Sequence, residues 1–157
     1  MTPAVALLKK RKQPFVLHQY AHDPRAQSYG LEAAEKLALP VERVFKTLVV
    51  QADGGELLVA VLPVGDSLNL KRMAAAAAVK RVAMAEPVLV ERATGYVLGG
   101  VSPLGQKKRL RTFIDSGAQQ HSSIYVSAGR RGLEIELAPQ LLQLLTSAQW
   151  AGLASQR

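Results

Sequence analysis

The sequence predicts one mixed α/β domain in which helices flank a curved sheet. Three observations support this fold class. The chain has 157 residues, which is the length of a single domain. Hydrophobic residues make up 48% of it and charged residues 20%, a balance typical of a chain with a packed core. Strand-like and helix-like segments are intermixed without a linker or a repeat, so residues 1–157 are expected to form one domain.

Capping residues and turns set the boundaries of the expected elements. Thr2 and Pro3 combine an N-cap residue with a proline at the first helical position. Asp53-Gly54-Gly55 separates two continuously apolar runs, which predicts a β-hairpin whose strands are covered on both faces. The helices are expected at residues 3–13, 29–39, 70–79, 87–93 and from 139 onward, and the strands at 15–20, 46–50, 57–62, 82–85, 112–115, 123–127 and 133–137.

Positive charge is the clearest compositional signal. The formal net charge is +8 and much of it is clustered. Such clusters favour a polyanionic partner, because neutralising phosphates releases counterions and supplies affinity. A solvated surface that keeps the protein soluble is the alternative. The clusters are Lys9-Lys10-Arg11-Lys12, Lys71-Arg72, Lys80-Arg81, Lys107-Lys108-Arg109 and Arg130-Arg131.

Several classes of site are disfavoured. The chain has no cysteine, so disulfides, thiolate metal sites and a cysteine nucleophile are excluded. His18 and His22 are spaced like two metal ligands on a helix, but their segment is expected to be a strand that ends in a turn, so no metal is expected. No Walker or dinucleotide motif indicates a cofactor. No apolar run approaches the roughly 20 residues of a membrane span, and the N-terminus lacks the order of a signal peptide, so a cytoplasmic protein is expected.

Two features are candidates for chemistry. Lys46 stands at the mouth of the most apolar strand, where it either extends its ammonium to the surface or places a useful charge in a cleft. The segment from Gly99 and Gly100 to Ser102 offers backbone N–H groups to an oxyanion, or it is a structural turn. Ser102 lacks the surroundings of a catalytic serine. From these residues alone, the function stays open.

Six segments, in order along nearly the whole chain, carry a family resemblance. They are Thr2-Pro3-Ala4, His22-Asp23-Pro24, Phe45-Lys46-Thr47-Leu48, the long stretch from Thr94 to Arg109, Ile124-Tyr125-Val126-Ser127 and Arg131-Gly132-Leu133. In these segments the chain resembles the YbaK-type Cys-tRNA(Pro)/Cys-tRNA(Cys) deacylases. These belong to a larger group related to the editing domain inserted in bacterial prolyl-tRNA synthetases.

The resemblance implies a barrel-like mixed sheet, no metal or other cofactor, and hydrolysis of a mischarged aminoacyl ester. Lys46 matches the essential polar side chain, and the substrate's own cysteine thiol is implied as the attacking group. Tyr29 stands where relatives usually carry Phe, and Glu134 where some carry Asp, which leaves the size and polarity of the pocket open. The expected substrate-binding residues are Tyr20, Tyr29, Thr47, Gly99, Gly100, Ser102 and Glu134, and the expected tRNA-binding residues are Lys107, Lys108, Arg109, Arg130 and Arg131.

The expected partner is a mischarged aminoacyl-tRNA, with prolyl-tRNA synthetase as a second candidate and neither a membrane nor DNA as a partner. Two alternatives remain at this point. One is a related trans-editing deacylase that prefers another small amino acid. The other is an RNA-binding module without catalysis, which the basic clusters alone would support.

Overall fold

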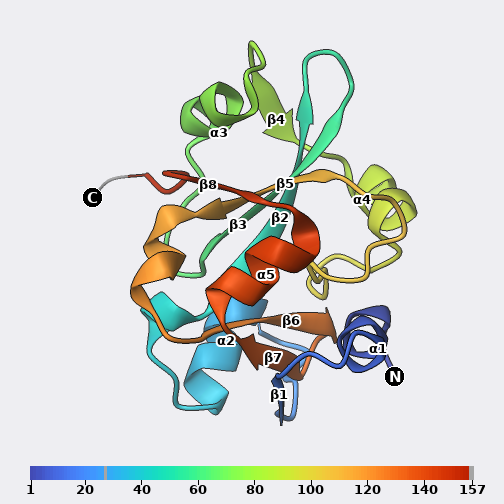
Figure 1. The fold of residues 1–157 in the computed structure, drawn as a ribbon, viewed down its shortest axis with the longest axis vertical. Helices are drawn as coiled ribbons and strands as arrows, with labels where there is room; N and C mark the ends of the chain where they lie inside the picture. Colours follow the sequence, from blue (N-terminus) through green and yellow to red (C-terminus); the bar gives the residue numbers. More distant parts are fainter. Residues whose placement is uncertain (27, 156–157) are drawn as a thin grey trace.

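A computed structural model of the protein describes residues 1–26 and 28–155 and shows a mixed α/β domain (Figure 1). Short 3₁₀ turns at Val41–Arg43 and Ser116–Gln120 complete the regular structure of the described part. No helix in that part is long and apolar enough to cross a membrane. The helices are α1 (Pro3–Lys10), α2 (Tyr29–Lys36), α3 (Leu70–Ala77), α4 (Pro87–Thr94) and α5 (Pro139–Thr146). The strands are β1 (Val16–Gln19), β2 (Phe45–Ala52), β3 (Leu57–Pro63), β4 (Val82–Met84), β5 (Arg111–Asp115), β6 (Ile124–Arg130), β7 (Leu133–Leu137) and β8 (Gln149–Ala151).

The larger sheet has five strands in the order β4-β2-β3-β5-β8. Its centre is the expected hairpin, in which β2 and β3 pair antiparallel from Phe45↔Pro63 to Gln51↔Leu57. Residues 58–62 of β3 are fully buried, which confirms that this strand is covered on both faces. Because side chains alternate along a strand, Val59 and Val61 enter one core cluster while Leu58, Ala60 and Leu62 enter another beneath α3.

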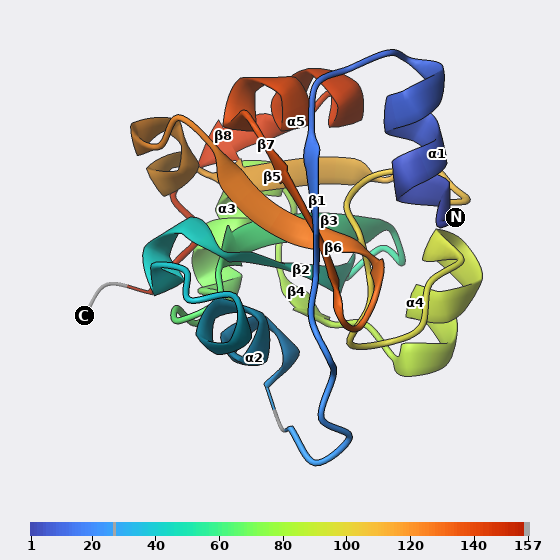
Figure 2. The same cartoon turned by 90° about the horizontal axis from the view of Figure 1, so that it is seen from below.

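The smaller sheet has three antiparallel strands in the order β1-β7-β6 and lies below the larger one in Figure 1. One face carries Ile124, Val126 and Ile135 into the main core. The opposite face carries polar side chains, including Glu134, toward the side where α2 packs. Figure 2 shows α2 and the small sheet together, with β1 crossing the view. The small sheet is therefore apolar on its core face and polar on the face that forms the candidate site.

The expected barrel-like sheet is wrong: the strands form two open sheets. A barrel needs one continuous hydrogen-bonded ladder that closes on itself. Here β6 pairs with β7, which pairs with β1, and this ladder stops there. Among the described residues, the isolated bridge between Val44 and Tyr125 is the one backbone pairing that links the sheets. The sheets are held together mainly by side-chain packing in the shared core.

Local capping explains why the helices begin where they do. The Thr2 side chain accepts a hydrogen bond from the backbone N–H of Val5, and Ser28 caps α2 through the N–H of Leu31. Prolines open α4 and α5 at their first turns. The first three helices, α1 to α3, end two or three residues earlier than expected, α4 ends within one residue of its expected end, and α5 stops at Thr146. The chain then adds β8, a strand that was not expected, parallel to β5.

Candidate active site

A pocket of about 400 Å³ lies between β2, α2, the polar face of the small sheet and the glycine-rich segment that follows α4. Most of the residues singled out from the sequence meet there, although they come from separate parts of the chain. The small sheet supplies one wall, and α2 and β2 supply others. Those that line it are Tyr20, Tyr29, Lys46, Thr47, Gly99, Arg130, Arg131 and Glu134.

Two predicted residues of the glycine-rich segment support the pocket without lining it. Ser102 is fully buried, and its Oγ accepts a hydrogen bond from the backbone N–H of Leu104 at 3.2 Å. Gly100 lies against the backbone of Arg130, where an added Cβ would come within 2.9 Å of the Arg130 Cα. The structure thus places both residues as packing elements of the loop.

Lys46 projects from β2 into the pocket and is half-buried. Its Nζ donates a hydrogen bond to the backbone carbonyl of Asp66 at 2.5 Å. Burial lowers the pKa of the Lys46 ammonium, and the nearby Asp66 carboxylate partly opposes that shift. An ammonium has several N–H donors, so this contact leaves donors for a bound group. Lys46 can therefore present a positive charge to an oxygen inside the pocket.

Glu134 contributes a buried carboxyl to the same pocket. It lies on β7, the central strand of the small sheet, and is only 7% exposed. Burial raises the pKa of Glu134 to about 8, so the carboxyl keeps its proton in neutral solution. None of the ion pairs in the described part of the chain involves its side chain, and no hydrogen bond contributes to its pKa.

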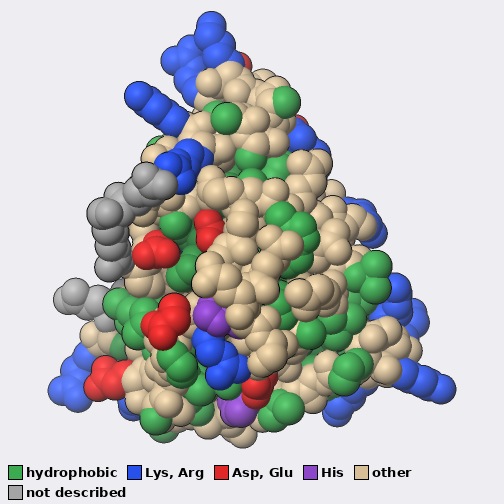
Figure 3. Space-filling model, turned by 60° about the vertical axis from the view of Figure 1, so that its left-hand side comes forward, with side chains coloured by type: hydrophobic (Ala, Val, Ile, Leu, Met, Phe, Trp, Pro, Cys, Tyr) green, Lys and Arg blue, Asp and Glu red, His purple; other side chains and the backbone are tan. Residues whose placement is uncertain are grey.

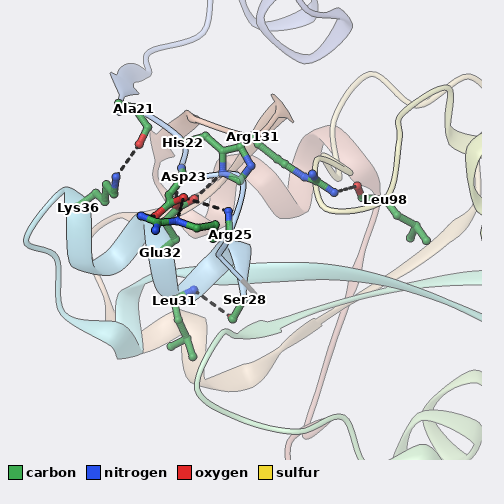
Figure 4. Close-up of polar contacts among 10 residues, drawn as sticks. All are labelled: Ala21, His22, Asp23, Arg25, Ser28, Leu31, Glu32, Lys36, Leu98 and Arg131. Atoms are coloured by element: carbon green, nitrogen blue, oxygen red, sulfur yellow. Dashed lines mark hydrogen bonds and ion pairs between the residues drawn. The ribbon is translucent and has the colours of Figure 1, made fainter.

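Contacts among Arg131, Tyr29 and the Leu98-Gly99 segment form one side of the pocket. The Arg131 guanidinium lies 3.8 Å from the centre of the Tyr29 ring, a cation–π arrangement. The same guanidinium donates to the Leu98 carbonyl at 3.0 Å, as Figure 4 shows. Gly99 has φ +86, and a Cβ there would come within 2.5 Å of the Tyr29 ring. Only glycine therefore lets the loop approach Tyr29 this closely.

The N-terminal part of α2, which carries Tyr29, is fixed by a buried carboxylate. His22 Nδ1 lies 2.7 Å from Glu32 Oε1, and the backbone N–H of Asp23 donates to Oε2 at 2.8 Å (Figure 4). Burial by itself raises the pKa of the Glu32 carboxyl, but the hydrogen bonds from His22 and Asp23 lower it overall. These contacts tie the segment before α2 to the helix and so set the position of Tyr29.

Comparison with known proteins identifies the family. Residues 23–144 match the aminoacyl-tRNA editing domain. The chain is 39% identical over 150 residues to EbsC of Enterococcus faecalis, which is named as a candidate Cys-tRNA(Pro)/Cys-tRNA(Cys) deacylase; the match covers 96% of this chain and 91% of that protein. The protein belongs to the aminoacyl-tRNA editing domain family.

Solved structures share the fold of this editing domain over nearly its whole length. A crystal structure of the hypothetical protein APE2540 matches with a TM-score of 0.87 and 25% sequence identity. The match covers 98% of this chain and 99% of the APE2540 chain. The structure of a candidate trans-editing enzyme for prolyl-tRNA synthetase matches with a TM-score of 0.86 and 22% sequence identity, and the match covers 98% of this chain and 96% of that enzyme.

The predicted tRNA-binding residues of the editing domain divide between two places. Arg130 and Arg131 lie at the pocket described above, whereas Lys108 and Arg109 line a second pocket of about 230 Å³ together with Arg11. In Figure 3, Lys and Arg side chains protrude at several separate points of one face of the molecule. On this face, the positive charge is thus distributed over separate points and is not gathered in one patch.

Sequence reasoning missed polar residues of the editing-domain pocket, among them Ser28 and Ser127. Ser127 lines it from β6, next to Glu134 in the strand register. It belongs to a motif that carried the resemblance, and its alternation with buried Val126 could have placed it on the polar face. Thr47 was expected in the site, but its hydroxyl is the one buried side-chain polar atom in the described chain without a hydrogen-bond partner. Such an atom is available to a ligand.

A serine, a carboxylate and a histidine meet outside the pocket, but in the wrong order for a catalytic triad. Ser123 Oγ donates to Glu136 Oε2 at 2.6 Å, and His18 Nε2 lies 2.9 Å from Glu136 Oε1. Glu136 therefore stands between the other two, whereas a triad needs the histidine beside the serine to take its proton. The arrangement is an ion-pair network that also contacts Arg43.

The raised pKa of Glu134 predicts a pH dependence of stability. Between its ordinary pKa of 4.5 and its folded value of about 8, the folded protein binds more protons than the unfolded chain. Its stability should therefore fall as pH rises through this window, by at most about 1.4 kcal/mol per pH unit from this group. Glu134→Gln should remove that slope, which urea unfolding across the window would measure.

Glu136→Gln is the matched control for this measurement. Hydrogen bonding from Ser123 lowers the pKa of the Glu136 carboxyl despite partial burial, so its contribution changes below the ordinary carboxyl pKa. The stability difference between this variant and the parent should stay level from weakly acid to weakly basic pH. An equally level difference for Glu134→Gln would contradict the prediction.

Proposed function

We propose that the protein is a trans-editing hydrolase that deacylates mischarged Cys-tRNA(Pro), with Cys-tRNA(Cys) as a second substrate. The observation that carries the proposal is a pocket with a half-buried lysine, a close-packed glycine loop and, among its described lining residues, no thiol and no histidine to activate a hydroxyl. The described lining residues include no histidine, and the chain has no cysteine. Family membership supports the reaction class, and the name of the Enterococcus relative supports the substrate.

The missing nucleophile is supplied by the substrate in the proposed reaction. The cysteine thiol gives up its proton as its sulfur forms a bond with the ester carbonyl carbon, and the bond between that carbon and the ribose oxygen breaks. The ribose oxygen takes up a proton, the cyclic thiolactone leaves, and water then opens it to free cysteine. Lys46 stabilises the negative charge that develops on the carbonyl oxygen. The protein then only has to bind the ester, orient the thiol and hold the charge.

The size and lining of the pocket favour a small aminoacyl group. A volume of about 400 Å³ lies at the lower end of the range for ligand pockets. Phe45 and Val101 supply apolar walls, while Thr47 and Ser127 supply hydroxyl groups. A cysteinyl group, with part of the terminal ribose, fits this mixture. A deacylase for another small amino acid is the alternative, because a pocket distinguishes side chains differing by one methylene only weakly.

Single-turnover deacylation of Cys-tRNA(Pro) by the purified protein tests the proposed function. Excess enzyme should release free tRNA far faster than spontaneous ester hydrolysis. Binding without release would instead favour the RNA-binding module that the basic surface alone supports. A panel that includes alanyl and seryl esters would distinguish a cysteinyl-tRNA deacylase from a deacylase that prefers another small amino acid.

The tRNA is the proposed macromolecular partner, and the cytoplasm, where tRNAs are charged and used, is the proposed location. Prolyl-tRNA synthetase is a second candidate partner, supported by the resemblance of the sequence to synthetase editing domains. Co-sedimentation of the purified protein with the synthetase, with and without tRNA, would test this association.

The basic segment next to the glycine loop gives a prediction about affinity. Replacing Lys107, Lys108 and Arg109 together with Ala should weaken binding of several tRNAs by similar factors, because phosphate contacts do not read sequence. The dependence of binding on salt should also become shallower, as fewer counterions are released. Filter binding at several salt concentrations measures both effects.

The control for this triple variant removes the same charge elsewhere. Lys71, Lys80 and Arg81 line a separate pocket beside α3 and β4. Their joint replacement with Ala should leave the salt dependence closer to that of the parent. If both triple variants lose the same amount of tRNA affinity, net charge determines the affinity and the segment after the glycine loop does not.

A further inference from the structure

Glu134 is an ionisable group of the pocket for which the described chain supplies no ion-pair partner. It lies between β1 and β6, with Ser127 as its register neighbour on one side and His18 on the other. Its side chain is nine-tenths buried and lines the pocket, and within the described chain no ion-pair partner for it is found. A buried carboxyl without a partner costs free energy, so it calls for a functional explanation.

Of the three cations that line the pocket with Glu134, Arg130 forms no ion pair with it in the described structure, and the other two are engaged with other groups. Lys46 on β2 donates to the Asp66 carbonyl, and Arg131 is held between the Tyr29 ring and the Leu98 carbonyl. Neither forms an ion pair with Glu134 in the described structure. The protein therefore presents a carboxyl to the pocket without supplying its counterion.

The remaining titratable groups near this carboxyl do not provide the counterion either. Tyr20 lies beside it, and burial first, then the Glu134 and Glu32 charges, raise the pKa of that phenol. His18 on β1 contacts Glu136, and Glu32 on α2 is paired with His22. A partner for Glu134 must then come with the ligand.

An aminoacyl ester brings a suitable group. Its α-amino nitrogen, next to the ester carbonyl, takes up a proton near neutral pH. We infer that the Glu134 carboxyl binds the α-ammonium group of the aminoacyl ester and thereby orients the ester toward Lys46. This inference rests on the proposed function and deepens it, because it assigns the feature by which the pocket recognises an amino acid.

The charges of the pocket match those of such a substrate. The positive amine meets the carboxyl of β7, and the carbonyl oxygen, which becomes negative as the ester is attacked, meets the ammonium of β2. Burial keeps the Glu134 carboxyl protonated in the empty pocket. On binding, a neutral amine can accept that proton, or an ammonium can displace it, and either route yields a buried pair of opposite charges.

The test compares two esters that differ only in the amine. Cysteinyl-tRNA carries the α-amine. The tRNA acylated with 3-mercaptopropionate keeps the thiol but lacks the amine. The parent protein should prefer the cysteinyl ester in kcat/KM on the order of 100-fold, because a buried polar group rejects an analogue that leaves it unpaired. Glu134→Gln should reduce this preference to a few-fold. Glutamine reproduces the neutral acid of the empty pocket, so folding should be retained.

Glu136→Gln, two residues along the same strand, should keep the preference of the parent protein. If Glu134→Gln keeps it too while both proteins hydrolyse the cysteinyl ester, the amine is not bound by Glu134 and the inference is overturned. If the parent protein hydrolyses neither ester, the proposed function itself fails. The two failures are thus distinguishable.

Discussion

Replacing Lys46 with Ala is expected to slow the release of tRNA from cysteinyl-tRNA on the order of 100- to 1,000-fold in single-turnover assays. The ammonium is half-buried and lines the pocket, where a positioned charge stabilises a developing oxyanion more strongly than it would in water. Removing one preorganised donor of this kind typically costs several kcal/mol of barrier.

Two further variants make the Lys46 result interpretable. Lys46→Met keeps the length and apolar character of the stem while it removes the charge, so it should lose about as much activity with a smaller effect on folding. Lys71→Ala removes a positive charge from an exposed position on α3 and should leave the rate unchanged. Near-normal turnover by Lys46→Ala and Lys46→Met, with unchanged unfolding midpoints, would refute the role proposed for Lys46.

The second large effect concerns the amino acid on the tRNA. Cysteinyl-tRNA should react on the order of 1,000-fold or more faster than seryl- or alanyl-tRNA. A thiol held next to the ester has an effective molarity that can reach about 10⁵ M or more, whereas the other two esters depend on water. The early product from the cysteinyl ester should be a cyclic thiolactone, which mass spectrometry of rapidly quenched reactions would detect.

This comparison also separates two mechanisms. If the alanyl ester is hydrolysed at a rate comparable to that of the cysteinyl ester, the enzyme must position a water molecule, and thiol assistance is wrong. Alanyl-tRNA is the stricter comparison, because its side chain lacks a heteroatom that could attack. The proposed role of Lys46 would survive that outcome, because either route passes through a negatively charged oxygen.

The contacts of the pocket predict that several site residues tolerate little change. Gly99 touches Tyr29, and Tyr29 is held by Arg131 on one side and by the α2 contacts of Glu32 on the other. Tyr29 supplies the aromatic ring on which the Arg131 guanidinium stacks.

Local signals in the sequence determined most of the elements. Thr2 and Ser28 accept hydrogen bonds at helix starts, and Asp53-Gly54-Gly55 turns the central hairpin, because capping and turn formation depend on neighbours within a few residues. The family motifs likewise directed attention to Lys46, and the structure brings it together with Tyr20, Tyr29 and Glu134 in one pocket.

Pairing between distant segments was decided only by the tertiary structure. Strand β8 exists because it pairs with β5 and because Asp115 accepts the backbone N–H groups of Leu153 and Ala154. The two sheets stay open because the smaller ladder stops at β1 and β6 and the larger one at β4 and β8, which local patterns do not reveal. Glu134 looks like an ordinary strand carboxylate in the sequence. Its burial on the central strand of the small sheet, and the raised pKa that follows, arise from the packing of segments far apart in the chain.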